Sequence, residues 1–333
     1  MYERKLIVKN QLLLILKQNT DYISGEAISD SLGVSRSAIW KVINKLKNEG
    51  YIIESKTNKG YKLISVPDII SEQELKDGLN TKYVGQKIYS FDEINSTNEQ
   101  AKKQAGSGAI NGSLFIADRQ TGGRGRLNKQ WSSPEKVGVW MSILLRPDVL
   151  PSKIMQISLI SGIVICKAIN NQTGLNAQIK WPNDIIINGK KVCGILTEMV
   201  TEEQRISFVV NGIGVNVNTL EFPEEIKDIA TSLYLETGKM FSRKLLIQEI
   251  LTSFEEYYEK FIFSDELTSI IDEYRSMCLN IGKEVVVIMN NKQIKGTAVG
   301  ITEIGELIIK TETGEIINVS SGEVSLRGVN GYF

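Results

Sequence analysis

The sequence contains no histidine among its 333 residues. Without an imidazole, the chain cannot build a Ser-His-Asp or Cys-His catalytic site, or a metal site with histidine ligands. Any chemistry must therefore use lysine, arginine, carboxylate and amide groups, together with Mg²⁺ that a bound nucleotide carries. One missing residue type thus excludes two large classes of catalytic site.

Cysteine is scarce, and long hydrophobic runs are missing. Cys166, Cys193 and Cys278 are widely separated in apolar surroundings, which predicts buried, reduced thiols and a cytoplasmic protein. No uninterrupted apolar run reaches the ~18 residues that a membrane span needs. The first residues, Met1 to Lys5, do not resemble a signal peptide. We therefore expect no membrane partner.

The charges balance over the whole chain, but they are unevenly distributed. Lysine and arginine number 39, as do aspartate and glutamate. Residues 1–66 hold 11 basic and 6 acidic residues, and the remainder holds 28 and 33. A basic first module on an acidic body predicts that only the first module binds a polyanion.

Residues 1–66 have the pattern of a winged helix-turn-helix. Helices are expected over residues 8–18, 24–32 and 36–48, the last capped by Ser35, with strands over 51–54 and 60–64. The third helix of such a unit enters the major groove. The alternative is a three-helix protein-interaction module. The residues expected to contact DNA are Ser35, Arg36, Ser37, Ala38, Lys41, Lys45, Lys56 and Lys59.

A glycine-rich basic loop runs from Gln120 to Trp131. Its glycines allow close backbone approach to a ligand, and Arg124 and Arg126 offer planar donors suited to carboxylate or phosphate. Such a loop is expected to order around an anion, with a solvated surface loop as the alternative. Its spacing fits neither a Walker loop nor a dinucleotide fingerprint.

A hairpin is predicted farther along the chain. Residues 179–187 and 191–199 are expected to be its strands, because Asn188-Gly189 between apolar runs is a strong turn signal. This places Asp184 and Lys191 on adjacent strands.

Together, the glycine loop, the run Lys180-Trp-Pro-Asn-Asp184 and the run Lys191-Val-Cys-Gly-Ile-Leu196 resemble the biotin protein ligase family, in its bifunctional, biotin operon repressor form. The resemblance covers nearly the whole chain. One position departs from it: the family loop often has a glycine after its arginines, where this chain has Leu127-Asn128.

The resemblance implies two half-reactions with ATP, Mg²⁺ and biotin. Biotin is adenylated to biotinyl-5′-AMP, and a lysine of a biotin carboxyl carrier domain then takes the biotinyl group. The implied catalytic residues are Lys191, Arg126, Lys180 and Asp184. The implied biotin-binding residues are Ser96, Thr97, Asn98, Gln120, Gly123, Arg124, Gly125, Arg126, Trp131, Lys191 and Gly194. The implied nucleotide-binding residues are Arg126, Lys129, Trp131, Lys180, Asn183, Asp184, Asn216 and Arg327. No protein metal site is implied.

The expected fold is α+β and multidomain. Residues 1–66 form the winged helix-turn-helix, 67–276 a mixed-sheet α/β ligase domain, and 277–333 an SH3-like small β-barrel, indicated by evenly spaced short strands after Cys278. A helix is also expected over residues 70–79. The resemblance further implies operator DNA as a partner and a homodimer favoured by biotinyl-5′-AMP, with Leu127 offering an apolar contact.

Other hypotheses stay open at this point. The chain could be a transcription factor that senses biotin without ligating it, or an octanoate or lipoate ligase of related architecture. The latter would lack this glycine loop. Incorporation of labelled biotin into a carrier domain separates these alternatives.

Overall fold

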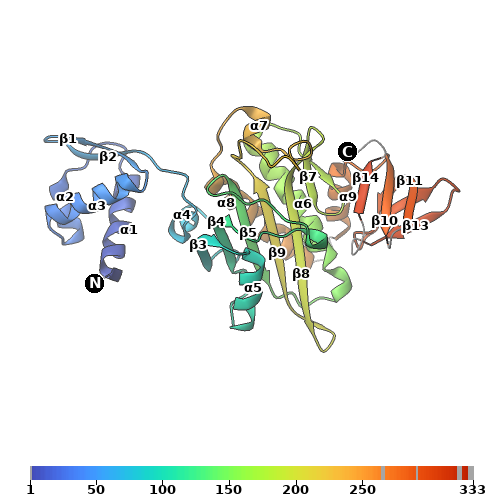
Figure 1. Cartoon of the computed structure of the whole chain (residues 1–333). Coiled ribbons are helices and arrows are strands. Elements are labelled where there is room, and N and C mark those ends of the chain that lie inside the picture. The colour runs from blue at the N-terminus through green and yellow to red at the C-terminus, as the bar shows by residue number, and fades with distance from the viewer. Residues whose placement is uncertain (1, 264–266, 290–291, 321–324, 329–333) are drawn as a thin grey trace. The chain divides into compact units, whose positions relative to one another are not determined.

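The structure, a computed structural model, describes residues 2–263, 267–289, 292–320 and 325–328 (Figure 1). The chain divides into two compact units, Met1–Ile69 and Ile70–Phe333. Each unit has its own hydrophobic core, and each is described by itself.

The first unit has the predicted order of elements: α1 (Tyr2–Gln18), α2 (Gly25–Leu32), α3 (Arg36–Asn48), β1 (Ile52–Lys56) and β2 (Gly60–Ser65). Ser24 and Ser35 cap α2 and α3, each accepting the backbone N–H three residues on. An antiparallel β1–β2 hairpin forms the wing. Leucine and isoleucine side chains from all three helices fill the core, so the winged helix-turn-helix is confirmed.

The second unit is built on a sheet of seven strands in the order β3-β4-β5-β9-β8-β7-β6. β3 and β4 are parallel, and every other neighbouring pair is antiparallel. The sheet is therefore mixed, as predicted. The strands are β3 (Ile88–Ile94), β4 (Leu114–Gln120), β5 (Gly138–Leu145), β6 (Gln178–Lys180), β7 (Asp184–Ile187), β8 (Lys190–Glu202) and β9 (Arg205–Asn216).

Helices cover both faces of this sheet. On one face α5 (Thr97–Gly106) packs through Ala101 and Ala105 against Phe115, Leu144 and other residues of β4, β5 and β9. On the other face lie α6 (Met155–Thr173), α8 (Arg243–Phe263) and α9 (Leu267–Met277). The remaining short helices are α4 (Glu72–Lys76), η1 (Arg126–Asn128), η2 (Pro151–Lys153) and α7 (Leu233–Thr237).

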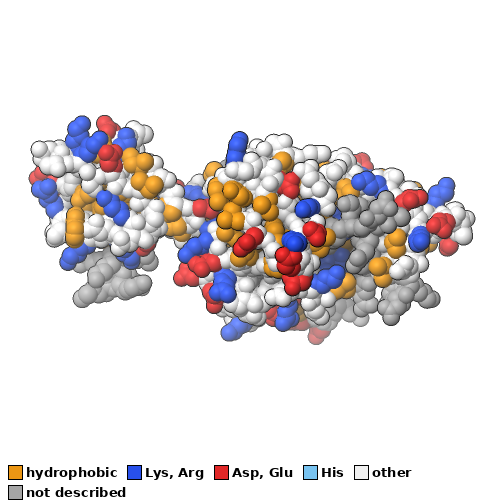
Figure 2. Space-filling model, turned by 45° about the horizontal axis from the view of Figure 1, so that its top comes forward, with side chains coloured by type: hydrophobic (Ala, Val, Ile, Leu, Met, Phe, Trp, Pro, Cys, Tyr) orange, Lys and Arg blue, Asp and Glu red, His pale blue; other side chains and the backbone are white. Residues whose placement is uncertain are grey.

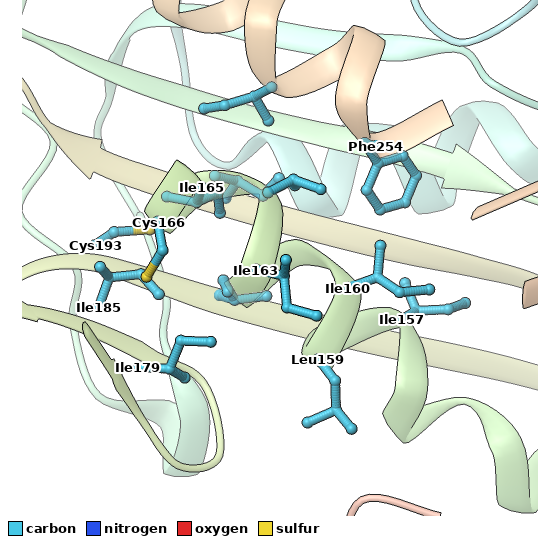
Figure 3. Packing of buried hydrophobic residues seen from close by; sticks show 14 of the residues in the cluster. Ile157, Leu159, Ile160, Ile163, Ile165, Cys166, Ile179, Ile185, Cys193 and Phe254 are labelled. Carbon is cyan, nitrogen blue, oxygen red and sulfur yellow. The ribbon is translucent and has the colours of Figure 1, made fainter. Parts of the chain in front are cut away.

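Helix α6 is the centre of the main core. Figure 3 shows its isoleucines, with Phe254 of α8 beside them and Ile179, Ile185 and Cys193 of the sheet around Cys166. The stretch Pro151–Thr173 is long and apolar enough to cross a membrane by length and composition, yet 78% of its most apolar window is buried within the protein. Burial on several sides explains why α6 is apolar nearly all round.

Two predicted elements differ from the structure. The strand predicted over 179–187 is divided into β6 and β7 by a turn at residues 181–183, because Pro182 has no N–H for the ladder. The helix predicted over 70–79 is only Glu72–Lys76. It ends early because Gly78 takes a positive φ of 96°, which a helix does not allow.

The C-terminal part is a five-stranded antiparallel sheet in the order β13-β12-β11-β10-β14. Its strands are β10 (Glu284–Met289), β11 (Lys292–Ile301), β12 (Leu307–Thr311), β13 (Ile316–Val319) and β14 (Ser325–Gly328). The domain predicted as an SH3-like small β-barrel is thus present as a small antiparallel sheet. Over the described residues, its end strands β13 and β14 are not paired with each other.

The C-terminal sheet shares the main core and contacts the turn between β6 and β7. Trp181 donates its indole N–H to the carbonyl of Gly305 (2.9 Å), and its backbone N–H to Asn280 Oδ1 (2.7 Å). Gly305 has a φ of 91° and lies against Leu159 and Met155 of α6. These two hydrogen bonds therefore attach the turn between β6 and β7 to the C-terminal part of the chain.

Candidate active site

A cavity of about 430 Å³ opens between the glycine loop, the start of α5, the turn between β6 and β7, and strands β8 and β9. Most of the predicted ligand-binding residues lie around it, although they come from five separate stretches of chain. Those that line it are Ser96, Thr97, Asn98, Gln120, Arg124, Gly125, Arg126, Lys129, Trp131, Lys180, Asn183, Asp184, Lys191, Gly194 and Asn216.

Among the predicted ligand-binding residues whose side chains the structure describes, Gly123 alone does not line the cavity. Gly123 lies behind it, where an added Cβ would come within 2.6 Å of the Trp131 carbonyl oxygen and 2.8 Å of Ser133 Oγ. Arg327 lies in β14, where the structure describes the backbone and not the side chain.

Two facing glycines make room for an indole ring. Gly194 of β8 is paired with Gly214 of β9. A Cβ on Gly214 would lie 2.6 Å from Trp131 Nε1, and one on Gly194 would lie 3.0 Å from the same ring. The ring also meets Trp140 edge-on, with centroids 6.4 Å apart. Close backbone approach is therefore the reason for glycine at both positions.

One end of the cavity is lined with neutral polar groups. Gln120 Oε1 accepts from the backbone N–H of Thr97 (2.9 Å) and from its hydroxyl (3.1 Å). The amide of Gln120 in turn donates to Ser133 Oγ (2.9 Å). Ser96 lines the cavity and is also the N-cap of α5, so the start of this helix forms part of the polar end. Such groups offer both donors and acceptors to a neutral polar ligand.

The other end carries concentrated positive charge. Lys191 Nζ lies 2.6 Å from Asp184 Oδ1 and 5.1 Å from the centre of the Trp131 ring. Arg126 donates to Asn183 Oδ1 at 3.1 Å. Burial lowers the pKa of the Arg126 guanidinium, while the charge of Asp184 opposes that shift. Fixed cations in a partly dry site suit a reaction that concentrates negative charge.

The glycine loop folds as a small hairpin over residues 123–131. Gly125 donates to the carbonyl of Lys129 (2.8 Å), and Trp131 donates to that of Gly123 (2.9 Å). At its tip, Leu127 and Asn128 both have a φ of 56°. The left-handed conformation is therefore adopted by Leu127 and Asn128, the two residues that stand where the family loop often has a glycine. For a leucine, this conformation costs about 1 kcal/mol or more.

Part of the lining was not predicted. Phe222, Ile226, Ile229 and Ala230 also line the cavity. They belong to an irregular segment between β9 and α7, which has no periodicity that a sequence could reveal. The segment is fixed to the site because Lys191 donates its backbone N–H to Ile229 O (2.8 Å) and accepts from Thr231 N–H (2.9 Å).

On the N-terminal unit, α3 carries several of the residues predicted to contact DNA. Arg36, Ser37 and Lys41 are exposed there, whereas Ala38 is half-buried. Trp40 of the same helix is 57% exposed and was not among the predicted DNA contacts. Figure 2 shows lysine and arginine side chains spread over the visible surface of this unit, with hydrophobic ones between them.

The wing adds three lysines around one aromatic ring. The ammonium groups of Lys56, Lys59 and Lys62 lie 5.0, 5.9 and 5.9 Å from the centre of the Tyr22 ring. Tyr22 and Lys62 were not among the predicted DNA contacts. Lysines held around an aromatic ring are suited to binding the phosphate backbone of DNA.

Three family models match the chain. Residues 90–216 match the biotin/lipoate A/B protein ligase family, residues 8–62 an HTH domain, and residues 281–327 the biotin protein ligase C terminal domain. The chain is 41% identical to the bifunctional ligase/repressor BirA of Bacillus subtilis, over 97% of this chain and 99% of that protein. It is 28% identical to the protein of the same name from Escherichia coli, over 95% and 96%.

Solved structures agree with these matches. The biotin protein ligase from Aquifex aeolicus in complex with biotin and ATP is 36% identical, with a TM-score of 0.64, over 73% of this chain and 99% of that chain. The architecture and the matches define a class, a cofactor–protein ligase with an N-terminal helix-turn-helix unit. Within that class, the chain belongs to the biotin protein ligase family.

Proposed function

We propose that the chain ligates biotin to a lysine of a biotin carboxyl carrier domain and represses transcription when biotinyl-5′-AMP is bound. The proposed ligase activity is supported by one observation, a cavity with a neutral polar end and a cationic end. A bicyclic urea suits the first end, and a carboxylate meeting the α-phosphate of ATP suits the second.

In the first half-reaction, a biotin carboxylate oxygen bonds to the α-phosphorus, and the bond from that phosphorus to the bridging oxygen breaks, releasing pyrophosphate. Lys191 and Arg126 would stabilise the added negative charge. Lys180, which is 4% exposed, and Asn183 would hold the nucleotide, with Lys129 and Asn216 on the same side. Trp131 would stack on the adenine ring.

In the second half-reaction, the acceptor amine attacks the biotinyl carbonyl, and AMP leaves with the bonding electron pair. The amine must lose a proton, and Asp184 is our candidate to accept it. ATP would enter with Mg²⁺. The described part of the chain contains no cluster of three or more Cys, Asp or Glu side chains able to hold a metal ion, so phosphate oxygens would supply most ligands.

The proposed repressor activity depends on the helix-turn-helix unit and on the tip of the glycine loop. One winged helix reads one half-site, and two-fold operators need a dimer. Leu127, 51% exposed at the loop tip, would contact a second copy once the adenylate fixes the loop. A ligand can shift this equilibrium only by binding the dimer more tightly than the monomer.

The deciding test of ligation uses radiolabelled biotin, ATP and a purified carrier domain, with an acceptor Lys→Arg carrier as control. Label on the wild-type carrier alone is expected. Biotin binding with no label transfer would favour a sensor that does not ligate.

Repression is tested by sedimentation and by binding to promoter DNA of the organism's biotin-synthesis genes, with and without biotinyl-5′-AMP. Equal dimer fractions and equal DNA affinities in the two conditions would refute the proposed regulation by biotinyl-5′-AMP.

The site of action that we propose is the cytoplasm. All three cysteines are free and buried, as suits a reducing compartment. The domain limits 1–66, 67–276 and 277–333 are likewise part of the proposal.

A further inference from the structure

Lys191 lies at an irregular point of the central sheet. Its partner on β7 is Ile186, whereas the next pair along the two strands is Ile185 with Cys193. Val192 is therefore an extra residue in β8, and such a bulge changes the direction of the side chains beside it. The pairing of β8 with β9 begins at Cys193. Lys191 thus lies outside the β8–β9 ladder, and other residues hold its backbone.

The irregular segment between β9 and α7 takes the place of β9 beside Lys191. Lys191 donates its backbone N–H to the carbonyl of Ile229 (2.8 Å) and accepts from the N–H of Thr231 (2.9 Å). These two bonds form a parallel bridge between Lys191 and Ala230, and they satisfy the main-chain groups of the lysine. The position of the Lys191 backbone therefore depends on where residues 229–231 lie.

Thr231 connects this segment to three neighbouring parts of the fold. It is 2% exposed, and its N–H is already bonded to Lys191. Its carbonyl accepts from Asn216 Nδ2 at the end of β9 (3.0 Å), and its hydroxyl donates to Glu236 Oε1 of α7 (2.5 Å). Lys191 and Asn216 both line the cavity, whereas Glu236 does not. Glu236 is thus one hydrogen-bonded residue away from the cavity wall.

Glu236 completes a ring of contacts around the backbone of Lys191. Its second oxygen, Oε2, accepts from Asn188 Nδ2 (2.6 Å). Asn188 belongs to the turn between β7 and β8, three residues before Lys191. The two oxygens of a carboxylate can accept from two separate donors at once. One side chain therefore joins the turn that leads into Lys191 to the segment that bonds to Lys191.

We infer that Glu236 is a positioning residue, which acts on the reaction through Lys191 without touching the ligand. The inference rests on the proposed function, because it takes Lys191 as the cation that stabilises the adenylation transition state. A shift of a reacting group by about 1 Å can cost on the order of 10²-fold in rate. Removal of the carboxylate leaves the backbone bonds between Lys191 and the segment in place, so a smaller loss is expected.

The test measures ATP–pyrophosphate exchange at saturating biotin and ATP in a Glu236→Leu protein. Leucine fills a similar space and removes both acceptor oxygens. The kcat for exchange is expected to fall about tenfold. Glu236→Gln should stay within about threefold of wild type, because its amide oxygen still accepts from Thr231 and the exposed Asn188 amide can turn to accept from its nitrogen.

The matched control is Glu224→Leu. Glu224 lies in the same irregular segment, but its side chain is 82% exposed and forms an ion pair with Lys227 at 2.6 Å. The control should keep wild-type exchange. It shows whether exchange is sensitive to any loss of a carboxylate from this segment.

A double-mutant cycle separates positioning from a general loss of structure. If Glu236 acts through Lys191, Glu236→Leu should slow exchange by less than about twofold in a protein that already carries Lys191→Met. A purely structural role would reduce exchange by the same factor in both backgrounds.

Wild-type kcat in a folded Glu236→Leu protein overturns the inference, and so does an equal loss with and without Lys191→Met. A wild-type protein that does not exchange pyrophosphate refutes the proposed function instead. If Glu236→Leu does not fold, Thr231→Val provides the test, because valine has nearly the same shape and lacks the hydroxyl that binds Glu236. It should lower kcat about tenfold in the presence of Lys191, and an unchanged kcat overturns the inference.

Discussion

Replacing Lys191 by methionine should nearly abolish adenylate formation. The substitution keeps an unbranched side chain that is one atom shorter, and it removes the cation that lies 2.6 Å from Asp184 and 5.1 Å from the Trp131 ring. Loss of one preorganised transition-state donor costs roughly 10²–10³ in rate, or about 3–4 kcal/mol. We expect a loss of that size in kcat.

The same substitution also affects stability. The Lys191 and Asp184 side chains are 23% and 14% exposed, so the pair is neither a surface nor a fully buried one. Exposed pairs contribute up to about 1 kcal/mol, and breaking a buried pair costs about 3–5 kcal/mol. We therefore expect a loss of about 1–3 kcal/mol, which leaves a folded protein.

The assay is ATP–pyrophosphate exchange at saturating biotin and ATP, together with thermal melting. Lys190→Met is the matched control, because Lys190 is exposed on the same strand and its side chain points to the other face of the sheet. The control should retain wild-type exchange. Exchange within tenfold of wild type in a folded Lys191→Met protein would refute the assignment.

A double-mutant cycle adds the role of Asp184. If this carboxylate acts in the first half-reaction only by holding Lys191, Asp184→Asn should slow exchange in the wild type and have little further effect beside Lys191→Met. Additive losses would mean that the two residues act separately.

Further predictions follow from other parts of the fold. A methyl at Gly214 would lie 2.6 Å from Trp131 Nε1, whereas one at Gly106 would meet nothing within 4 Å. Gly214→Ala should therefore lower adenylation about tenfold or more, and Gly106→Ala should leave exchange unchanged. Deletion of residues 1–66 should retain ligation of the carrier and abolish DNA binding; a folded truncation that cannot ligate contradicts this modular division. Burial raises the pKa of Cys278 to about 11 and raises that of the other two thiols as well. Because the thiolate is the reactive form, a thiol reagent at pH 8 should label all three cysteines in urea and none in the native protein. Rapid native labelling would be inconsistent with their burial.

Local chemistry made much of the fold predictable. Ser35 caps α3 and Asn188-Gly189 makes the predicted turn, because caps and tight turns depend on a few neighbouring residues. The extent of the β8–β9 hairpin was harder to predict, since its turn is Glu203-Gln204, both at positive φ. Neither residue type signals such a turn.

The cavity was predictable only in part. Motif residues could be named, but Phe222 and Ile226 reach the cavity through an irregular segment whose course depends on tertiary contacts. The hydrogen bond from Asn98 to Glu198 and the ion pair of Glu198 with Lys102 could not be predicted either, because Glu198 and Lys102 are 96 positions apart. Residues that touch a ligand leave a motif in the sequence, whereas residues that orient them through space need not.

The hydrogen bond from Trp181 to the carbonyl of Gly305 has a consequence for domain exchange. The turn that carries Asn183 is held by a backbone oxygen of the C-terminal sheet, and the tight φ of 91° at Gly305 puts that oxygen in place. A chimera with a foreign C-terminal domain would keep every side chain that lines the cavity among the described residues. It would still misplace the nucleotide end unless the grafted domain reproduced this one glycine turn. Compatibility between the two domains thus depends on backbone shape, and sequence identity across the junction would be a poor guide to it.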